Sequence, residues 1–173
     1  MRFFTMEQDK SLPDMIKLRD FDICGPRHIF LKRDAGEINA STTLYLSENS
    51  GETAPDFIQS PIPLVSDMVK KVLDAYEDDM VFRQVSLIDK ERGTILLYHI
   101  LLLEEQDMLS DRAEFYPNGS IKRLVLDRGK IGEHKIFLLD RRRFRNPFVS
   151  LEVVESLLRR SMTGIIFREV EVE

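Results

Sequence analysis

Apolar residues follow a helical spacing in two segments of the chain. Between residues 64 and 77 they recur every three or four positions, with Pro63 and Ser66 as start signals, which predicts an amphipathic helix. A second helix is predicted to begin at Ser150, a favourable N-cap residue, and to stop at Thr163-Gly164. Gly164 is expected to cap that helix in a left-handed conformation.

The remaining apolar segments have the alternation and β-branched content of strands. Residues 81–88 and 94–103, separated by turn residues at 91–93, predict a hairpin whose second strand is buried. Further strands are expected at residues 29–31, 42–46, 121–126, 134–139 and 165–172. Few helices and clustered hairpins predict an α+β fold, with antiparallel strand hairpins and two main amphipathic helices.

A connection rich in proline and glycine at residues 48–63 is the clearest break in the pattern. It suggests a poorly defined strand-rich segment at residues 1–55 and an α+β unit at residues 56–173. Two arrangements fit: one domain, or a small N-terminal subdomain followed by the main unit. The sequence shows no internal repeat.

Composition describes an ordinary globular chain of 173 residues, 43% hydrophobic and 32% charged. Cys24 is the only cysteine, so no internal disulfide can form, and this fits a reducing compartment such as the cytoplasm. The longest apolar run, residues 95–103, is about half of the roughly 20 residues that a membrane-spanning helix needs. The first residues lack the pattern of a signal peptide. We therefore expect a cytoplasmic protein without a membrane partner.

The net charge of −5 is unevenly distributed. Residues 64–120 carry 6 basic and 12 acidic side chains, whereas residues 121–173 carry 12 basic and 8 acidic ones. An acidic middle argues against direct nucleic-acid binding, which needs lysine and arginine to replace phosphate counterions. It suits a basic protein partner, because opposite potentials speed encounter.

Motifs that carry chemistry are missing from the sequence. Neither glycine-rich phosphate loops nor a Gly-x-Ser-x-Gly nucleophile elbow occurs. His28, His99 and His134 lack the spacing of zinc ligands, and a single cysteine cannot form a CxxC pair. Asp20-Phe21-Asp22 could contribute to a magnesium site but is more typical of a surface. We expect no catalytic residue, no cofactor and no metal.

Two charged clusters are candidates for binding. Arg141, Arg142, Arg143 and Arg145 surround Phe144, a pattern typical of nucleic-acid binding, of a solvated turn between strand and helix, or of a partner for the acidic segment. Acidic residues gather in two places, at the end of the first predicted helix and after the buried strand: Glu77, Asp78, Asp79, Glu104, Glu105 and Asp107. The helix dipole disfavours the first three, so stability alone does not explain them. We expect these six carboxylates to face a partner, against the simpler interpretation of a hydrated surface.

Several short motifs in the second half occur in a characteristic order. They are Pro63-Leu64-Val65-Ser66-Asp67, a strand centred on Tyr98, Leu124-Val125-Leu126-Asp127, Ile131-Gly132-Glu133-His134-Lys135-Ile136-Phe137-Leu138-Leu139, Phe148-Val149-Ser150 and Thr163-Gly164-Ile165-Ile166-Phe167. This succession resembles the bacterial immunity proteins of polymorphic toxin systems, formerly a domain of unknown function. The resemblance runs from about Asp56 to the C-terminus.

The resemblance implies a non-enzymatic antitoxin, encoded beside a secreted toxin, that binds and neutralises it in the cytoplasm. It transfers no catalytic residue and does not identify the toxin. The alternative is an enzyme or small-ligand-binding domain whose site combines dispersed carboxylates with His99. A large concave pocket with convergent polar groups would favour that alternative.

Overall fold

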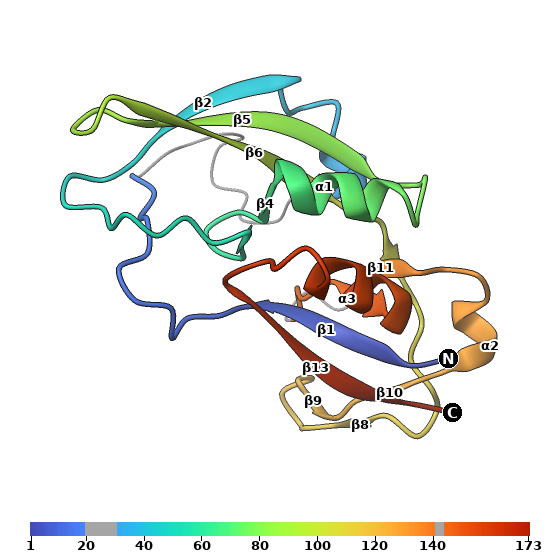
Figure 1. The fold of residues 1–173 in the computed structure, drawn as a ribbon. Coiled ribbons are helices and arrows are strands. Elements are labelled where there is room, and N and C mark those ends of the chain that lie inside the picture. The colour runs from blue at the N-terminus through green and yellow to red at the C-terminus, as the bar shows by residue number, and fades with distance from the viewer. Residues whose placement is uncertain (20–30, 141–143) are drawn as a thin grey trace.

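Two mixed β-sheets and two helices packed between them form the body of the protein (Figure 1). The computed structural model describes residues 1–19, 31–140 and 144–173. The architecture is α+β, as predicted from the sequence. Three short helices occur in the described part: α1 (Asp67–Asp74), α2 (Arg128–Ile131) and α3 (Leu151–Leu158), with a 3-10 turn at Lys32–Asp34.

The upper sheet in Figure 1 has five strands, in the order β2 (Ser41–Tyr45), β5 (Val81–Asp89), β6 (Thr94–Leu102), β4 (Leu64–Ser66) and β3 (Phe57–Ile58). The lower sheet has the order β10 (Val125–Leu126), β13 (Ile165–Val172), β1 (Phe3–Gln8), β12 (Phe148–Ser150), β11 (Ile136–Leu139) and β7 (Glu105–Gln106). A separate ribbon pairs β8 (Glu114–Phe115) with β9 (Ile121–Arg123).

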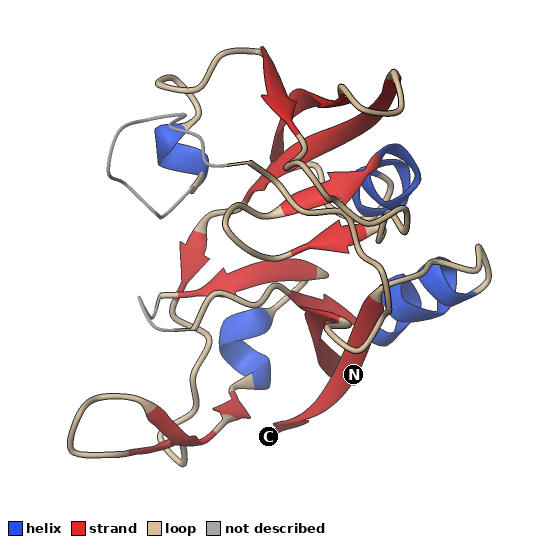
Figure 2. Ribbon diagram, turned by 90° about the vertical axis from the view of Figure 1, so that its left-hand side faces the viewer, coloured by secondary structure: helices blue, strands red, loops and turns tan. Residues whose placement is uncertain are grey.

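The central core lies where the two sheets face each other. Helices α1 and α3 contact one another there, through buried residues such as Val69 and Leu73 on α1 and Val153 and Leu157 on α3. Figure 2 shows both helices on the same side of the molecule, between the two sets of strands. Two further apolar clusters cover the outer faces of the five-stranded and six-stranded sheets. Each sheet is therefore covered on both faces over part of its area.

The two sheets repeat one topology, which the sequence analysis missed. Strands β2-β5-β6-β4-β3 correspond to β10-β13-β1-β12-β11, and the first pair is parallel in both sheets while the other three pairs are antiparallel. We call β2 to β6 with α1 the first unit, and β10 to β13 with α3 and β1 the second unit. In each unit a short strand leads directly into the helix.

Strand register makes the repeat specific at the level of residues. The carbonyl of Pro63 accepts a hydrogen bond from Leu101 at 2.9 Å, and that of Pro147 accepts one from Met6 at 2.8 Å. The matching segments are Pro63-Leu64-Val65-Ser66 with Pro147-Phe148-Val149-Ser150, and Phe82-Arg83-Gln84-Val85 with Phe167-Arg168-Glu169-Val170. The repeat is hard to see in the sequence because the last strand of the second unit, β1, stands at the N-terminus.

The N-terminal strand therefore occupies the middle of the six-stranded sheet. β1 pairs with β12 on one side and with β13 on the other, so the two chain ends lie side by side (Figure 1). Strand β2 likewise pairs with β5 of the first unit. The division expected at residue 55 thus separates both N-terminal strands from the strands that they pair with.

The helices are shorter than predicted where residues expected to be helical pair with strands instead. The first helix was expected at 64–77, but it spans Asp67–Asp74, because Leu64 and Val65 pair with β3 and β6. Ser66 is its N-cap, and the hydroxyl accepts from the Val69 N–H at 3.3 Å. Ser150 also precedes its helix in extended conformation, as predicted, but its side chain makes no capping hydrogen bond.

Two other predictions need correction. The strand expected at 121–126 is split at Leu124, since β9 joins the separate ribbon and β10 joins the six-stranded sheet. Gly164 does have a positive φ of 73°, but α3 already ends at Leu158 with Arg159 as its C-cap. Gly164 instead lies against Pro55, where a Cβ would come 2.4 Å from the proline Cβ.

Replacing Gly164 with alanine should lower the free energy of unfolding by about 2–4 kcal/mol, because a left-handed backbone and a steric overlap add together. Chemical denaturation measures the change. Gly36→Ala is the matched control, since nothing lies within 4 Å of its Cβ position and no unfavourable φ applies. Equal stability of the two variants would contradict the role assigned to Gly164.

Moving residues 1–10 behind Glu173 through a short linker should preserve the fold, because β1 and β13 are antiparallel neighbours and Phe3 pairs with Val170. The permuted chain would restore both units to the same strand order. Circular dichroism and a cooperative thermal transition test this. Deleting residues 1–10 without reattachment should instead abolish cooperative unfolding, since β12 and β13 each lose the partner between them and the six-stranded sheet is divided.

Candidate functional site

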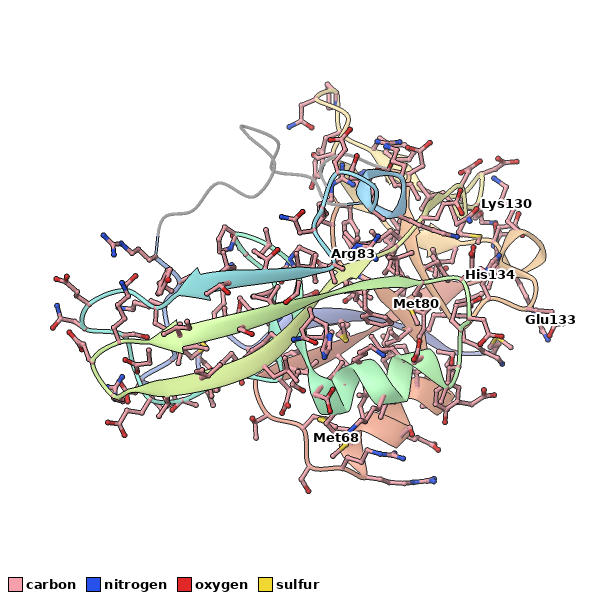
Figure 3. All side chains as sticks on the ribbon, turned by 90° about the horizontal axis from the view of Figure 1, so that it is seen from above. Met68, Met80, Arg83, Lys130, Glu133 and His134 are labelled. Carbon is pink, nitrogen blue, oxygen red and sulfur yellow. The ribbon has the colours of Figure 1, made fainter. Side chains whose placement is uncertain are left out.

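The structure brings together three of the six predicted carboxylates. Glu77 and Asp79 follow α1, Glu104 follows β6, and all three line one shallow groove, of only about 10 Å³, together with Gln106 and His134. Figure 3 shows Lys130, Glu133 and His134 at the end of the molecule toward which α1 runs. We call this end, with its carboxylates at 77–79 and 104–107, the acidic end.

Two of the predicted carboxylates serve the fold. Glu77 accepts a hydrogen bond from the backbone N–H of Lys135 at 3.0 Å, and only 16% of its side chain is exposed. Glu105 is 11% exposed and lies between two guanidinium groups, 2.7 Å from Arg145 and 3.4 Å from Arg33. Both carboxylates are largely buried and are bonded within the chain, so neither points toward a partner protein.

The other four carboxylates are open to solvent. Asp78 is exposed, and the side chains of Asp79, Glu104 and Asp107 are 57%, 58% and 70% exposed. Asp79 forms an ion pair with Lys32, which also lies 4.0 Å from Glu104. These four are the part of the predicted site that another protein could reach.

The argument from the helix dipole does not hold. Helix α1 ends at Asp74, and Ala75 is its C-cap, so residues 77–79 lie beyond the last turn. The effect of the dipole falls off within that turn. The position of Glu77 is explained instead by its hydrogen bond to Lys135 of the second unit.

Sequence reasoning missed three basic residues of this end, Lys32, Arg33 and Lys130, which form ion pairs with the predicted carboxylates. Arg145 pairs with Glu105, in agreement with the interpretation of the arginine cluster as a partner for the acidic segment. The partners are separated by 23 to 72 residues along the chain, so local spacing gave no signal. Their positive charges make the acidic end less negative than the count of carboxylates suggested.

Two cavities lie between the units. One has a volume of about 360 Å³ and is mainly apolar; its walls include Leu31, Pro63, Leu103, Leu138 and Pro147, with Arg145 at the side. The other, of about 420 Å³, is polar and is lined by Leu31, Lys32, Arg33, Glu104, Glu105 and Asp140. Leu31 lines both. The polar cavity contains the ion pairs already described.

His99 lies apart from both cavities, on the face of β6 that α1 covers. Its Nε2 is 3.3 Å from the Asp67 carboxylate, and its ring meets that of Phe82 edge-on. The Lys71 ammonium, and after it the His99 imidazole, lower the pKa of Asp67 below its usual value. This contact joins the start of α1 to the sheet, and the structure does not bring His99 together with the six predicted carboxylates.

Several candidates lie outside the described residues: Asp20-Phe21-Asp22, Cys24, His28, and the arginines 141–143. Within residues 1–19, 31–140 and 144–173, no group of three or more His, Cys, Asp or Glu side chains could hold a metal ion. None of the helices in the same ranges has the length and apolar character to cross a membrane. No protein-family model and no curated protein matches this chain.

Glu105→Gln should lower the free energy of unfolding by about 2–3 kcal/mol, because two guanidinium groups lose a largely buried counter-charge. Glu104→Gln, its neighbour in the sequence, is 58% exposed and should change stability by less than about 0.5 kcal/mol. Urea denaturation of both variants compares them directly. A larger loss for Glu104 than for Glu105 would contradict this assignment.

Proposed function

We propose that the protein is an immunity protein, which binds a cognate toxin domain and blocks it without catalysing a reaction. The observation that carries the proposal is the acidic end, where exposed carboxylates from two distant segments meet beside a shallow groove. The succession of motifs that resembles immunity proteins supports the same function. We further propose a cytoplasmic location, in keeping with the single cysteine.

The chemistry of the acidic end favours a basic partner. Asp79 and Glu104 present negative charge at the groove, and Lys32 is the basic residue that pairs with both. Asp78 and Asp107 are exposed nearby in the sequence, and Asp107 pairs with Lys130. A toxin that acts on nucleic acid carries a basic substrate site, which such a surface would match. Charges at the rim of an interface act mainly on the association rate and are screened by salt over about 8 Å at physiological ionic strength.

Replacing Asp78, Asp79 and Glu104 by Asn, Asn and Gln should slow association with the toxin domain encoded beside this gene by about tenfold at low salt. The difference from the wild type should shrink as salt is added. Surface plasmon resonance gives the rates, and survival of cells that express the toxin gives the biological result. The matched control replaces Glu48, Glu52 and Glu155, which are exposed elsewhere, by Gln.

Two outcomes distinguish the proposed interface at the acidic end from the proposed immunity function. An unchanged association rate in the first triple variant would remove the acidic end from the interface while leaving the immunity function in place. A neighbouring gene that encodes no toxin, or a toxin that the wild-type protein neither binds nor neutralises, would overturn the immunity function itself.

The apolar cavity favours a second candidate, a domain that binds a small ligand. Its volume of about 360 Å³ is in the range of ligand sites, and it lies at the junction of the two units. This keeps the alternative of an enzyme or ligand-binding domain, although His99 and the carboxylates that were expected to form such a site lie elsewhere. Saturable binding of a small apolar molecule, lost in Leu103→Trp, would support it.

A further inference from the structure

The first unit exposes an apolar face near the free end of its hairpin. Tyr45, Ile88 and Ile95 are neighbours across β2, β5 and β6, and Leu97 is the next residue on the same face of β6. Three of the four are clearly exposed, Ile95 at 67%, Leu97 at 44% and Tyr45 at 38%, and Ile88 is half-buried. We call these four residues the hairpin patch.

The patch is uncovered because α1 is too short to span the sheet. The eight residues of α1 extend for roughly 12 Å, whereas the nine-residue strands β5 and β6 run for roughly 30 Å. The contact between Asp67 and His99 fixes the start of the helix two residues beyond Leu97. The hairpin then projects away from the helix (Figure 3).

The second unit shows that the fold does not require an apolar face here. Tyr98 of the first unit and Phe3 of the second are equivalent, because each pairs with the N-cap serine of its unit. The residues just before them are therefore also equivalent, and Arg2 takes the place of Leu97. By the same register Glu173 takes the place of Ile88. Arg2 forms an ion pair with Glu169, and Arg123 one with Glu171, on the corresponding face.

One topology therefore carries two faces of opposite character. A charged face is sufficient for folding, as the second unit demonstrates, so the apolar residues of the first unit need another explanation. The four side chains, three exposed and one half-buried, offer roughly 300 Å² of apolar surface, the size at which such a patch on a monomer is often an interaction site.

We propose that the hairpin patch binds the same patch of a second copy of this chain, in a two-fold dimer. The charges at its two ends favour this occupant. Lys90, over the ring of Tyr45, and Glu91 lie at the hairpin turn, whereas Asp67 begins α1 and forms an ion pair with Lys71 in the last turn of that helix. A two-fold rotation about Leu97 places each turn over α1 of the other copy, where the Asp67–Lys71 pair within each chain is exchanged for pairs between the copies. Lys90 then faces Asp67, and Glu91 faces Lys71.

The second unit also limits the assembly. Its equivalent face is charged, so each chain offers one apolar face, and an isologous contact closes at two copies. The area is small, since even with its charged rim the contact falls below the roughly 1,200 Å² of a standard stable interface. The dimer is therefore weak and forms at high protein concentration.

Sedimentation equilibrium of the full chain, from about 10 µM to about 1 mM, should show a monomer–dimer equilibrium. Leu97→Arg, which copies the residue of the second unit, should raise the dissociation constant at least tenfold. Leu158→Arg is the matched control, because Leu158 is 58% exposed on α3 and should leave the constant within about twofold. Circular dichroism confirms that both variants fold.

A charge exchange tests the two-fold geometry. Glu91→Lys and Lys71→Glu should each weaken the dimer, and the double variant should restore it. A monomeric mass at every concentration, or a dimer that Leu97→Arg leaves unchanged, would overturn the proposal. The measurement contains no toxin, so its failure leaves the proposed immunity function untouched, and failure of toxin binding leaves the dimer untouched.

Discussion

The position of β1 is the constraint on which the rest of the structure depends. This strand pairs with β12 and β13 at the same time, and without it the second sheet would be open in its middle. Its residues also face both ways, since Met6 belongs to the central core and Phe3 to the cluster on the outer side of the six-stranded sheet. Closing the second unit thus completes two cores and brings the termini together.

Reciprocal contacts then hold the two units together. The carbonyl of Thr163, after α3, accepts a hydrogen bond from the N–H of Asp56 ahead of β3 at 2.8 Å, and the N–H of Thr163 donates to the Asp56 carboxylate at 2.7 Å. Glu77, after α1, accepts from the N–H of Lys135 ahead of β11. The segment that follows each helix therefore binds the residue that precedes a strand of the other unit, β3 or β11.

Comparison of the two units distinguishes residues that the fold requires from surface residues that are available for a partner. Both units keep the proline, valine and serine that lead from strand to helix, because these positions set strand pairing and helix start. The exposed faces differ between the units, apolar beside β6 and charged beside β1. The acidic end and the hairpin patch lie beyond opposite ends of α1, so a toxin and a second copy of the chain would not compete for one surface.

The sequence by itself determined the fold class, the hairpin of β5 and β6, the serine ahead of α1 and of α3 and the strand that ends the chain, because these depend on local residue patterns. The prediction that the second hairpin strand is buried was wrong for its first half, where Ile95 and Leu97 are exposed because α1 does not reach them. Tertiary structure alone decided that Leu64 and Val65 are a strand, that β1 belongs to the second unit, and that Glu77 and Glu105 are structural. Each of those outcomes depends on a partner distant in the chain: His99, Val170, Lys135 and Arg145. Local patterns carry no information about such pairs, so the acidic cluster could be found in the sequence while the roles of its members could not.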